Sequence, residues 1–145
     1  MKGSTYRRCA CRNPETGKQW GQACPKFSQK RHGLWGLRQE LPSRPDGKRR
    51  IFRRGGYASA GAAQTDLDHV RSLLALPDAD DDEGHSRIAD LLELVAKERS
   101  PLPDIEETRR LLRRGQSLTS RLTVGEWLDM WLASKKTRKT TTNGY

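Results

Sequence analysis

The segment from residue 34 to residue 76 constrains the fold most, because two short strand patterns precede one helix pattern and each has a single apolar face. In LWGLRQELP, residues 34–42, apolar residues alternate with glycine and charged residues, as in a half-buried strand. The Pro-Asp-Gly turn in SRPDGK then leads into a second strand, within DGKRRIFRRGGYAS at residues 46–59. Tyr57 and Ala58 follow a Gly-Gly break and can begin a short third strand.

A helix is predicted after these strands, with Ser59 as its N-cap and Pro77 as its stop. Its apolar residues recur at helical spacing and form one stripe: Ala63, Leu67, Val70 and Leu74. A hairpin and a single helix are each unstable alone, so they are expected to bury their apolar faces against each other. The strand residues expected against the helix are Trp35, Leu37, Tyr57 and either Ile51 or Phe52. The predicted fold class is α+β, a small three-stranded antiparallel sheet packed on one helix and followed by α-helical segments.

The charge of the chain is concentrated in its first part. Residues 1–60 contain 15 Lys and Arg against 3 Asp and Glu, whereas the net charge of all 145 residues is +10. Residues 61–100 are acidic, and residues 101–145 are mildly basic. Positive charge this concentrated typically neutralises nucleic-acid phosphates and releases their counterions. A solvated basic surface that keeps the protein soluble is the alternative interpretation.

The face of the predicted sheet that points away from the helix has no partner in this chain. A narrow sheet fits the major groove of DNA, where arginine pairs bidentately with guanine O6 and N7. If Phe52 points to the helix, the residues expected to share the exposed face and read bases are Arg38, Arg49 and Arg53. The residues then expected nearer the edges, on phosphates, are Lys48, Arg50 and Arg54. If Ile51 is buried instead, the two sets exchange roles, and a merely solvated strand is the remaining alternative.

Three cysteines and a histidine form a pattern within residues 1–33. Cys9 and Cys11 are followed by Cys24 and then by His32. Three thiolates and one imidazole satisfy tetrahedral zinc, and a segment with almost no apolar residues needs such a crosslink. An odd number of cysteines without a secretion signal argues against a disulfide framework. The C-x-C spacing is tighter than the roughly two- to four-residue spacing usual in zinc sites, so three ordinary reduced cysteines are the alternative.

Residues 77–119 are expected to form an acidic linker and a helical connector. PDADDDEGH, residues 77–85, has the composition of an exposed linker. Ser86 can cap one helix, and Asp104 can cap another that ends at Gly115. After residue 119, TVGEWLDMWLASKK combines a capping box with apolar residues at i, i+3, i+4 and i+7. Two tryptophans on that stripe need a larger partner surface than this chain provides.

Signals for catalysis and for membrane insertion are both missing from the sequence. It contains no Ser-His-Asp arrangement, phosphate loop or H-E-x-x-H motif. The acidic run DADDDE lacks the ligand and glycine spacing of a calcium loop. No run of about 18 apolar residues and no secretion signal occurs. The chain is therefore not expected to be an enzyme or to cross a membrane.

HGLWGLRQELP, DGKRRIFRRGGYAS and TVGEWLDMWL together resemble the N-terminal portion of phage-type tyrosine recombinases, the integrases of actinobacterial mobile elements. The resemblance covers nearly the whole chain and includes a CxC…CP…HG pattern in residues 1–33. It implies an arm-type DNA-binding domain over residues 34–76, similar to plant ethylene-response domains. It also implies that residues 120–145 begin a helical core-binding domain, one half of a clamp around the crossover DNA. The implied partners are double-stranded DNA and other recombinase protomers, in the bacterial cytoplasm with the nucleoid.

The chain departs from that family in two respects. Gly61 and Ala62 stand where relatives carry charged helix formers, which weakens the first helical turn. The catalytic domain, with its tyrosine nucleophile and surrounding basic residues, has no counterpart, and Tyr145 falls in the core-binding pattern. The expectation is a truncated, DNA-binding portion of an integrase without strand-cleaving activity. The alternative is a small zinc-containing regulator that binds DNA or RNA and has a helical partner-binding region.

Overall fold

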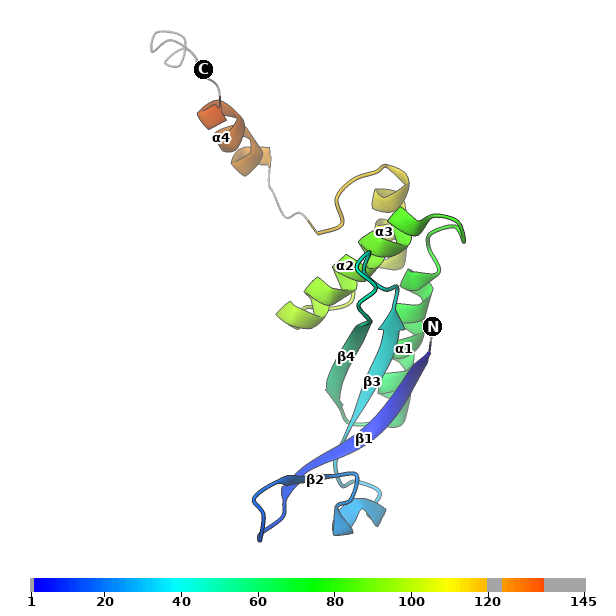
Figure 1. Ribbon diagram of the computed structural model, residues 1–145, viewed down its shortest axis with the longest axis vertical. Helices are drawn as coiled ribbons and strands as arrows, with labels where there is room; N and C mark the ends of the chain where they lie inside the picture. Colours follow the sequence, from blue (N-terminus) through cyan, green and yellow to red (C-terminus); the bar gives the residue numbers. More distant parts are fainter. Residues whose placement is uncertain (1, 120–123, 135–145) are drawn as a thin grey trace.

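The computed structural model describes residues 2–119 and 124–134, and Figure 1 shows their arrangement. Four strands form one antiparallel sheet: β1 (Gly3–Arg12), β2 (Gln19–Gly21), β3 (Leu34–Leu41) and β4 (Arg50–Tyr57). The helices are the short 3-10 helix η1 (Pro25–Ser28), α1 (Ala60–Leu74), α2 (Asp82–Glu98), α3 (Ile105–Arg113) and α4 (Val124–Ser134). The predicted α+β class is confirmed, with four strands in place of three.

Strand β1 lies inside the sheet, whose strand order is β2-β1-β3-β4. Strands β1 and β2 lie in residues 1–33, for which the sequence indicated no strand. The predicted short third strand from Tyr57 is wrong, because Tyr57 ends β4. In the register with β3, Thr5 is opposite Leu37 and Arg7 is opposite Trp35, so the inward positions of β1 are polar. A strand with polar inward positions shows no apolar alternation in the sequence.

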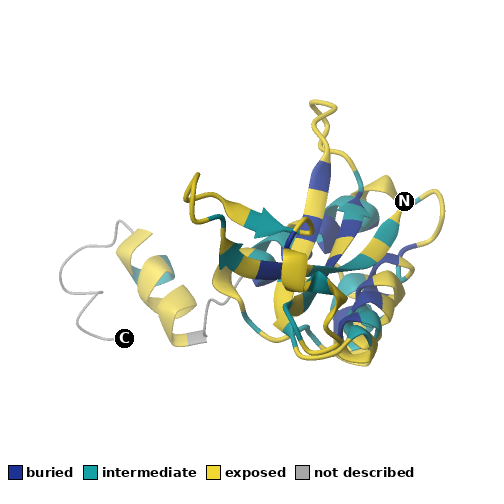
Figure 2. Cartoon of the chain, turned by 90° about the horizontal axis from the view of Figure 1, so that it is seen from below, coloured by how far each residue is buried: buried dark blue, intermediate teal, exposed yellow. Residues whose placement is uncertain are grey.

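The strand register settles which of Ile51 and Phe52 faces the helices. Phe52 is 1% exposed and belongs to the core, whereas Ile51 is 40% exposed on the opposite face. Residues directly opposite each other on neighbouring strands share a face of the sheet, and Arg38 is opposite Arg53. The sheet therefore has an inner face containing Phe52 and an outer face containing Arg38 and Arg53. Figure 2 shows the resulting alternation of buried and exposed bands along the strands.

Helix α1 covers the inner face as the sequence predicts. The Ser59 hydroxyl caps it by accepting a hydrogen bond from the Ala62 N–H at 3.1 Å. The predicted apolar stripe is buried: Ala63, Leu67, Val70 and Leu74. Among the strand residues predicted against the helix, Leu37 and Phe52 are buried, whereas Tyr57 and Trp35 are half-buried.

Helix α2 starts four residues before its predicted N-cap at Ser86. Asp81 caps it instead, and its carboxylate accepts a hydrogen bond from the Gly84 N–H at 2.8 Å. The end of the predicted acidic linker thus forms the first turn, where Asp82 and Glu83 meet the positive end of the helix dipole. The apolar residues of α2 join the core that the sheet forms with α1: Ile88, Leu91, Leu92 and Val95. Part of the predicted connector is therefore packed against the sheet.

Helices α3 and α4 follow their sequence signals. The Asp104 carboxylate caps α3 by accepting from the Glu107 N–H at 2.8 Å, and Gly115, with a φ of 66°, follows the end of the helix. In α4 the rings of Trp127 and Trp131 are stacked, with centroids 6.3 Å apart. The predicted cap Thr123 and residues 135–145 lie outside the described residues. Within the described part of the chain, every helix is too short or too polar to cross a membrane.

Candidate functional site

The four residues predicted to bind metal come together at the far end of β1. Cys9 and Cys11 lie on β1, Cys24 immediately precedes η1, and His32 precedes β3. Their ligand atoms all lie within 4.8 Å of one another. The His32 Nε2 atom is 3.3 Å from the Cys24 sulfur and 3.6 Å from the Cys11 sulfur. Metal–ligand bonds of about 2.0–2.3 Å in a tetrahedral site separate sulfur and nitrogen by about 3.6 Å, so the cluster fits a tetrahedral metal ion.

The C-x-C spacing, unusual for a metal site on a turn, suits a strand. Side chains two residues apart on a strand point to the same side, so Cys9 and Cys11 both face the cluster. A register irregularity against β2 lies between Cys9 and Arg12, at this end of β1. The strand geometry therefore explains how the C-x-C spacing, tighter than is usual in zinc sites, can bring both thiols to one site.

Cys9 and Cys24 are each 5% exposed, and all three cysteines are free thiols. Desolvation raises the pKa of Cys9, and its hydrogen bond with Cys24 adds to this increase. Desolvation also acts to raise the pKa of Cys24, but hydrogen bonds from the Lys26 N–H and from the other two thiols outweigh it and lower the pKa. Cys24 is therefore the more acidic of these two thiols, and the thiolate is the form that binds metal.

Arg7 connects the cluster to the sheet, a role that the sequence did not indicate. Its guanidinium stacks on the Phe27 ring, 4.2 Å from the centroid, and lies 5.9 Å from the Trp35 ring. It donates hydrogen bonds to the carbonyl oxygens of Phe27 and Gln29. These contacts fix the segment between Cys24 and His32 against the sheet. Only the position of Arg7, two residues before Cys9 on the same face of β1, could have suggested this role.

Gly33 allows the chain to pass from His32 into β3. Its φ is 87°, in the left-handed region, and a Cβ atom at this position would lie 2.7 Å from the Arg8 carbonyl oxygen. Glycine is therefore needed both for the backbone conformation and for the close approach to β1. The turn places His32 beside the thiols of the cluster.

The outer face of the sheet forms a second candidate site. Its residues line a shallow groove of about 370 Å³: Ser4, Tyr6, Arg8, Gln22, Arg38 and Arg53. Arg38 lies between Ser4 on β1 and Arg53 on β4 in the strand register. Arg8, Arg38 and Arg53 are exposed, and none of them forms an ion pair with another described residue. Like charges directly opposite each other destabilise a sheet, so an anionic ligand is favoured there.

A second groove, of about 740 Å³, links the outer face to the cluster. Tyr6 and Arg8 line it together with His32, Cys11 and several glycines. A Cβ atom on Gly36 would lie 2.9 Å from the Tyr6 ring, so the ring covers this glycine. The exposed basic surface of β1 is therefore adjacent to the Cys/His cluster, two of whose residues, Cys9 and Cys11, lie on the same strand.

The structure divides the six arginines and lysines that the sequence predicts to bind DNA into four exposed residues and two that point to the inner face. Arg38, Arg49 and Arg53 are exposed, as the Phe52-inward register requires. Lys48 is also exposed, in the turn before β4, and forms an ion pair with Asp46 at 3.1 Å.

The predicted placement of Arg50 and Arg54 near the edges of the exposed face is wrong. The Arg50 side chain is 4% exposed and its guanidinium is 2.6 Å from the Asp90 carboxylate of α2. Arg54 is half-buried, 3.8 Å from Asp66 of α1, and donates a hydrogen bond to the Ser100 carbonyl. Both residues alternate in phase with Phe52 and therefore point to the inner face, where the helices supply their partners.

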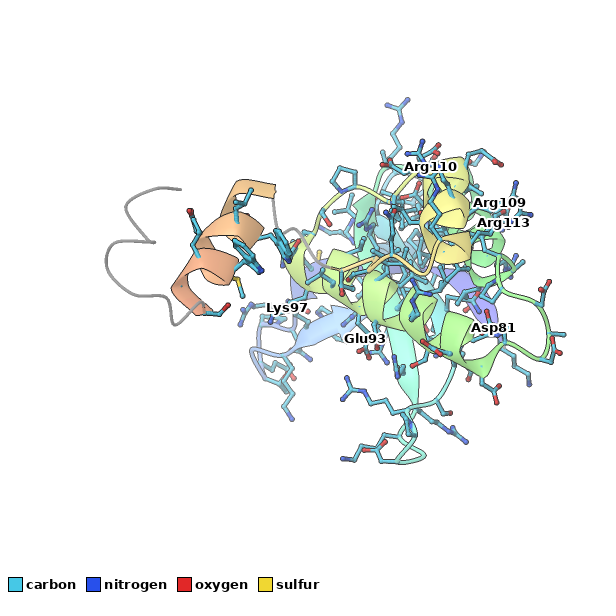
Figure 3. All side chains as sticks on the ribbon, turned by 90° about the horizontal axis from the view of Figure 1, so that it is seen from above. Asp81, Glu93, Lys97, Arg109, Arg110 and Arg113 are labelled. Carbon is cyan, nitrogen blue, oxygen red and sulfur yellow. The ribbon has the colours of Figure 1, made fainter. Side chains whose placement is uncertain are left out.

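A further basic group lies on α3 and its C-cap residue: Arg109, Arg110, Arg113 and Arg114. Figure 3 labels three of these arginines on this helix. Arg109 is 2.7 Å from Glu106, and Arg110 is 3.8 Å from Glu107. Ion pairs thus partly neutralise this surface, whereas Arg8, Arg38 and Arg53 of the outer face form none with another described residue.

No protein-family model, curated protein or solved structure matches this chain.

Proposed function

We propose that this chain binds double-stranded DNA through the outer face of its sheet, as the DNA-binding N-terminal portion of a site-specific tyrosine recombinase. The observation that carries the proposal is the pair of opposed arginines, Arg38 and Arg53. Both are exposed on a sheet face that the helices leave uncovered. Guanidinium groups on neighbouring strands can pair with guanine edges in the major groove, while the nearby Arg8 reaches the backbone phosphates.

The proposal assigns a structural zinc ion to the cluster. Three sulfur donors and one nitrogen donor are the set that zinc prefers, and softer donors of this kind disfavour magnesium and calcium. Four protein ligands fill a tetrahedral coordination sphere and leave no position for a substrate. The ion would hold β1 in place, and with it Tyr6 and Arg8 on the outer face. Native mass spectrometry of protein purified without chelator tests this assignment, which predicts one zinc ion per chain.

The test of DNA binding starts from a duplex selected in vitro from a randomised pool. Fluorescence anisotropy then compares this duplex with a scrambled duplex, a single strand and a structured RNA, between about 50 and 200 mM salt. The full chain is expected to prefer the selected duplex, with a steep salt dependence. An R38A variant is expected to lose about 1–3 kcal/mol of discrimination between selected and scrambled duplexes, because it removes a base contact.

The matched control is R113A, which removes the same charge from the exposed surface of α3. It is expected to weaken binding to both duplexes by a similar small factor. Equal loss of discrimination in R38A and R113A would contradict base reading by the sheet. Stronger binding to the structured RNA than to any duplex would favour the alternative function, a regulator that binds RNA.

A further inference from the structure

A basic cleft lies at the free edge of β4, next to the end of α2, and shares Arg53 and Gly55 with the grooves described above. Its volume is about 620 Å³ and it is lined by Arg53, Arg54, Gly55, Ala96 and Arg99. β4 is an edge strand, so the cleft lies where the sheet ends. Among the described residues, the lining contains three arginines and no acidic residue. This composition fits an oxyanion.

Arg99 occupies a backbone conformation that usually belongs to glycine. It follows the last residue of α2 with a φ of 54°, and its N–H donates to the Val95 carbonyl. It is the only non-glycine residue with positive φ in the described part of the chain. This conformation costs about 1 kcal/mol or more for a residue with a side chain, and glycine would avoid that cost. The arginine side chain thus stands at a position where stability alone favours glycine.

Arg54 is held rigidly at the other side of the cleft. Its guanidinium lies 5.7 Å from the Phe52 ring centroid and donates a hydrogen bond to the Ser100 carbonyl. Asp66 offsets its charge only in part, because the 3.8 Å separation is long and the same carboxylate oxygen accepts the Tyr57 hydroxyl at 2.7 Å. Gly55 adds no side chain, and a Cβ atom there would meet open space. The cleft therefore stays accessible between the arginines.

The end of α2 contributes a partial negative charge of about half a unit, which opposes anion binding. Together with Asp66 it reduces the positive charge of the cleft, yet three guanidinium groups still exceed these two contributions. Guanidinium groups bind phosphate oxygens bidentately and keep their charge at any physiological pH. A site of this composition favours a phosphate over a carboxylate, because a phosphate offers more oxygen atoms to three donors.

We propose that this cleft binds one phosphate group of the DNA backbone. This inference rests on the proposed function, since Arg53 belongs to both the outer face and the cleft. A DNA phosphate in the cleft would lie beside the major groove that the sheet is proposed to enter. It would fix the position of the sheet without reading sequence, which is the usual role of phosphate contacts. The same chemistry would also accept a free phosphate ion.

The first experiment tests anion binding without DNA. Inorganic phosphate is titrated into the full chain in the millimolar range, against chloride at equal ionic strength, and amide shifts are followed by NMR. Shifts are expected at Gly55 and Arg99 and are expected to vanish in an R99N variant. Asparagine tolerates the left-handed conformation, so this variant keeps the end of α2 intact. Absence of any shift at the cleft in the wild-type chain would overturn the site.

The second experiment measures the salt dependence of binding to the selected duplex. R99N is expected to lower the slope of log affinity against log salt by about one, with the preference among sequences unchanged. The control is K97Q, which removes one exposed charge from the same end of α2 without altering the cleft lining (Figure 3). Its slope is expected to change much less. Equal slopes in R99N and K97Q would overturn the DNA phosphate contact, even if the wild-type chain binds the duplex tightly.

The two experiments separate failure of this inference from failure of the proposed function. One outcome is that phosphate shifts the amide resonances of the cleft while the wild-type chain binds no duplex. In that case DNA is not the source of the phosphate, and the proposed function fails as well. If the wild-type chain binds the selected duplex but neither experiment distinguishes R99N, the proposed function stands and the cleft assignment is overturned.

Discussion

The two ends of the sheet are stabilised by different kinds of interaction. Where α1 and α2 cover the inner face, apolar side chains from strands and helices form one continuous core. At the far end of β1, beside β2 and η1, the buried residues are Cys9 and Cys24, and the contacts are made by thiols, an imidazole and Arg7 (Figure 1). One strand thus passes from the side of the apolar core to a polar cluster of thiols and an imidazole.

The difference follows from how few apolar residues the chain contains. Only 33% of its residues are hydrophobic, and the large ones that are buried all lie in the core under the helices. A small unit with too little apolar surface requires another source of stability, and a metal crosslink is one such source. The basic outer face spans both ends, so each end supports part of the proposed DNA-binding surface.

The largest expected effect is that of removing the proposed zinc ion. Treatment with a chelator is expected to abolish hydrogen-exchange protection in residues 7–33, because bound zinc supplies most of the stability of such segments, about 10–16 kcal/mol in small zinc-dependent peptides. Protection of α1 and β4 is expected to remain, since their core contains no metal ligand. Hydrogen exchange followed by mass spectrometry measures both ends at once. Equal loss of protection in α1 would show that the two ends unfold as one unit.

A smaller effect is expected at the helical end. F52A is expected to destabilise the protein by about 3–5 kcal/mol, because it leaves a cavity among Leu37, Leu67 and other buried side chains. I51A, on the next residue, removes a side chain that is 40% exposed on the outer face and is expected to cost under about 1 kcal/mol. Denaturant unfolding of both variants measures the difference. Similar losses would contradict the register of β4, and zinc stoichiometry should be unchanged in both.

How far the sequence predicts this molecule depends on the range of each signal. The hairpin of β3 and β4, the Ser59 cap and the apolar stripe of α1 are local patterns, and all were predicted. β1 was not, because its inward positions are polar and its pairing with β3 is long-range. The burial of Arg50 depends on Asp90, 40 residues away on a helix that no local pattern places against β4.

The residues of the cluster and of the outer face also differ in how well the sequence predicts their positions. The grouping of the three cysteines and His32 was predictable, because cysteine and histidine are few and their chemistry is specific. Arg7 was not, because its hydrogen-bond partners are backbone carbonyls, which every residue has. Tyr6 and Arg8 reach the outer face only through the pairing of β1 with β3, so the sequence could not assign them to it.

Arg7 offers a way to weaken the proposed zinc site without changing Cys9, Cys11, Cys24 or His32. R7A is expected to lower zinc affinity by about 10- to 100-fold, because groups that hold a metal-binding segment in place have effects of this size. R8A, the neighbour on the outer face, removes the same charge and is expected to leave zinc affinity within about twofold. Competition with a chromophoric chelator measures both. If R8A lowers the affinity as much as R7A does, general electrostatics and not the Arg7 contacts stabilise the site.

The smallest expected effect concerns Tyr57, which links β4 to α1 where the sheet meets its helical core. Its hydroxyl donates to the Asp66 carboxylate at 2.7 Å. Burial of the phenol raises the pKa of Tyr57 above its ordinary value, and the hydrogen bond to Asp66 raises it further. Y57F is expected to destabilise the protein by about 1–2 kcal/mol at neutral pH, because a hydrogen bond to a charged group is lost.

The contribution of Tyr57 to the free energy of unfolding is expected to depend on pH. The unfolded chain releases the Tyr57 proton at a pKa of about 10, whereas the folded chain retains it to higher pH. The contribution of this proton to stability is therefore complete below about pH 10 and declines above it, because ionisation then favours the unfolded chain. The difference in unfolding free energy between wild type and Y57F is expected to be constant from neutral pH to about pH 9 and to shrink above about pH 10. Chemical denaturation at a series of pH values measures this difference. A difference that grows above pH 10 would mean that Tyr57 ionises more readily in the folded protein, contrary to its burial beside Asp66.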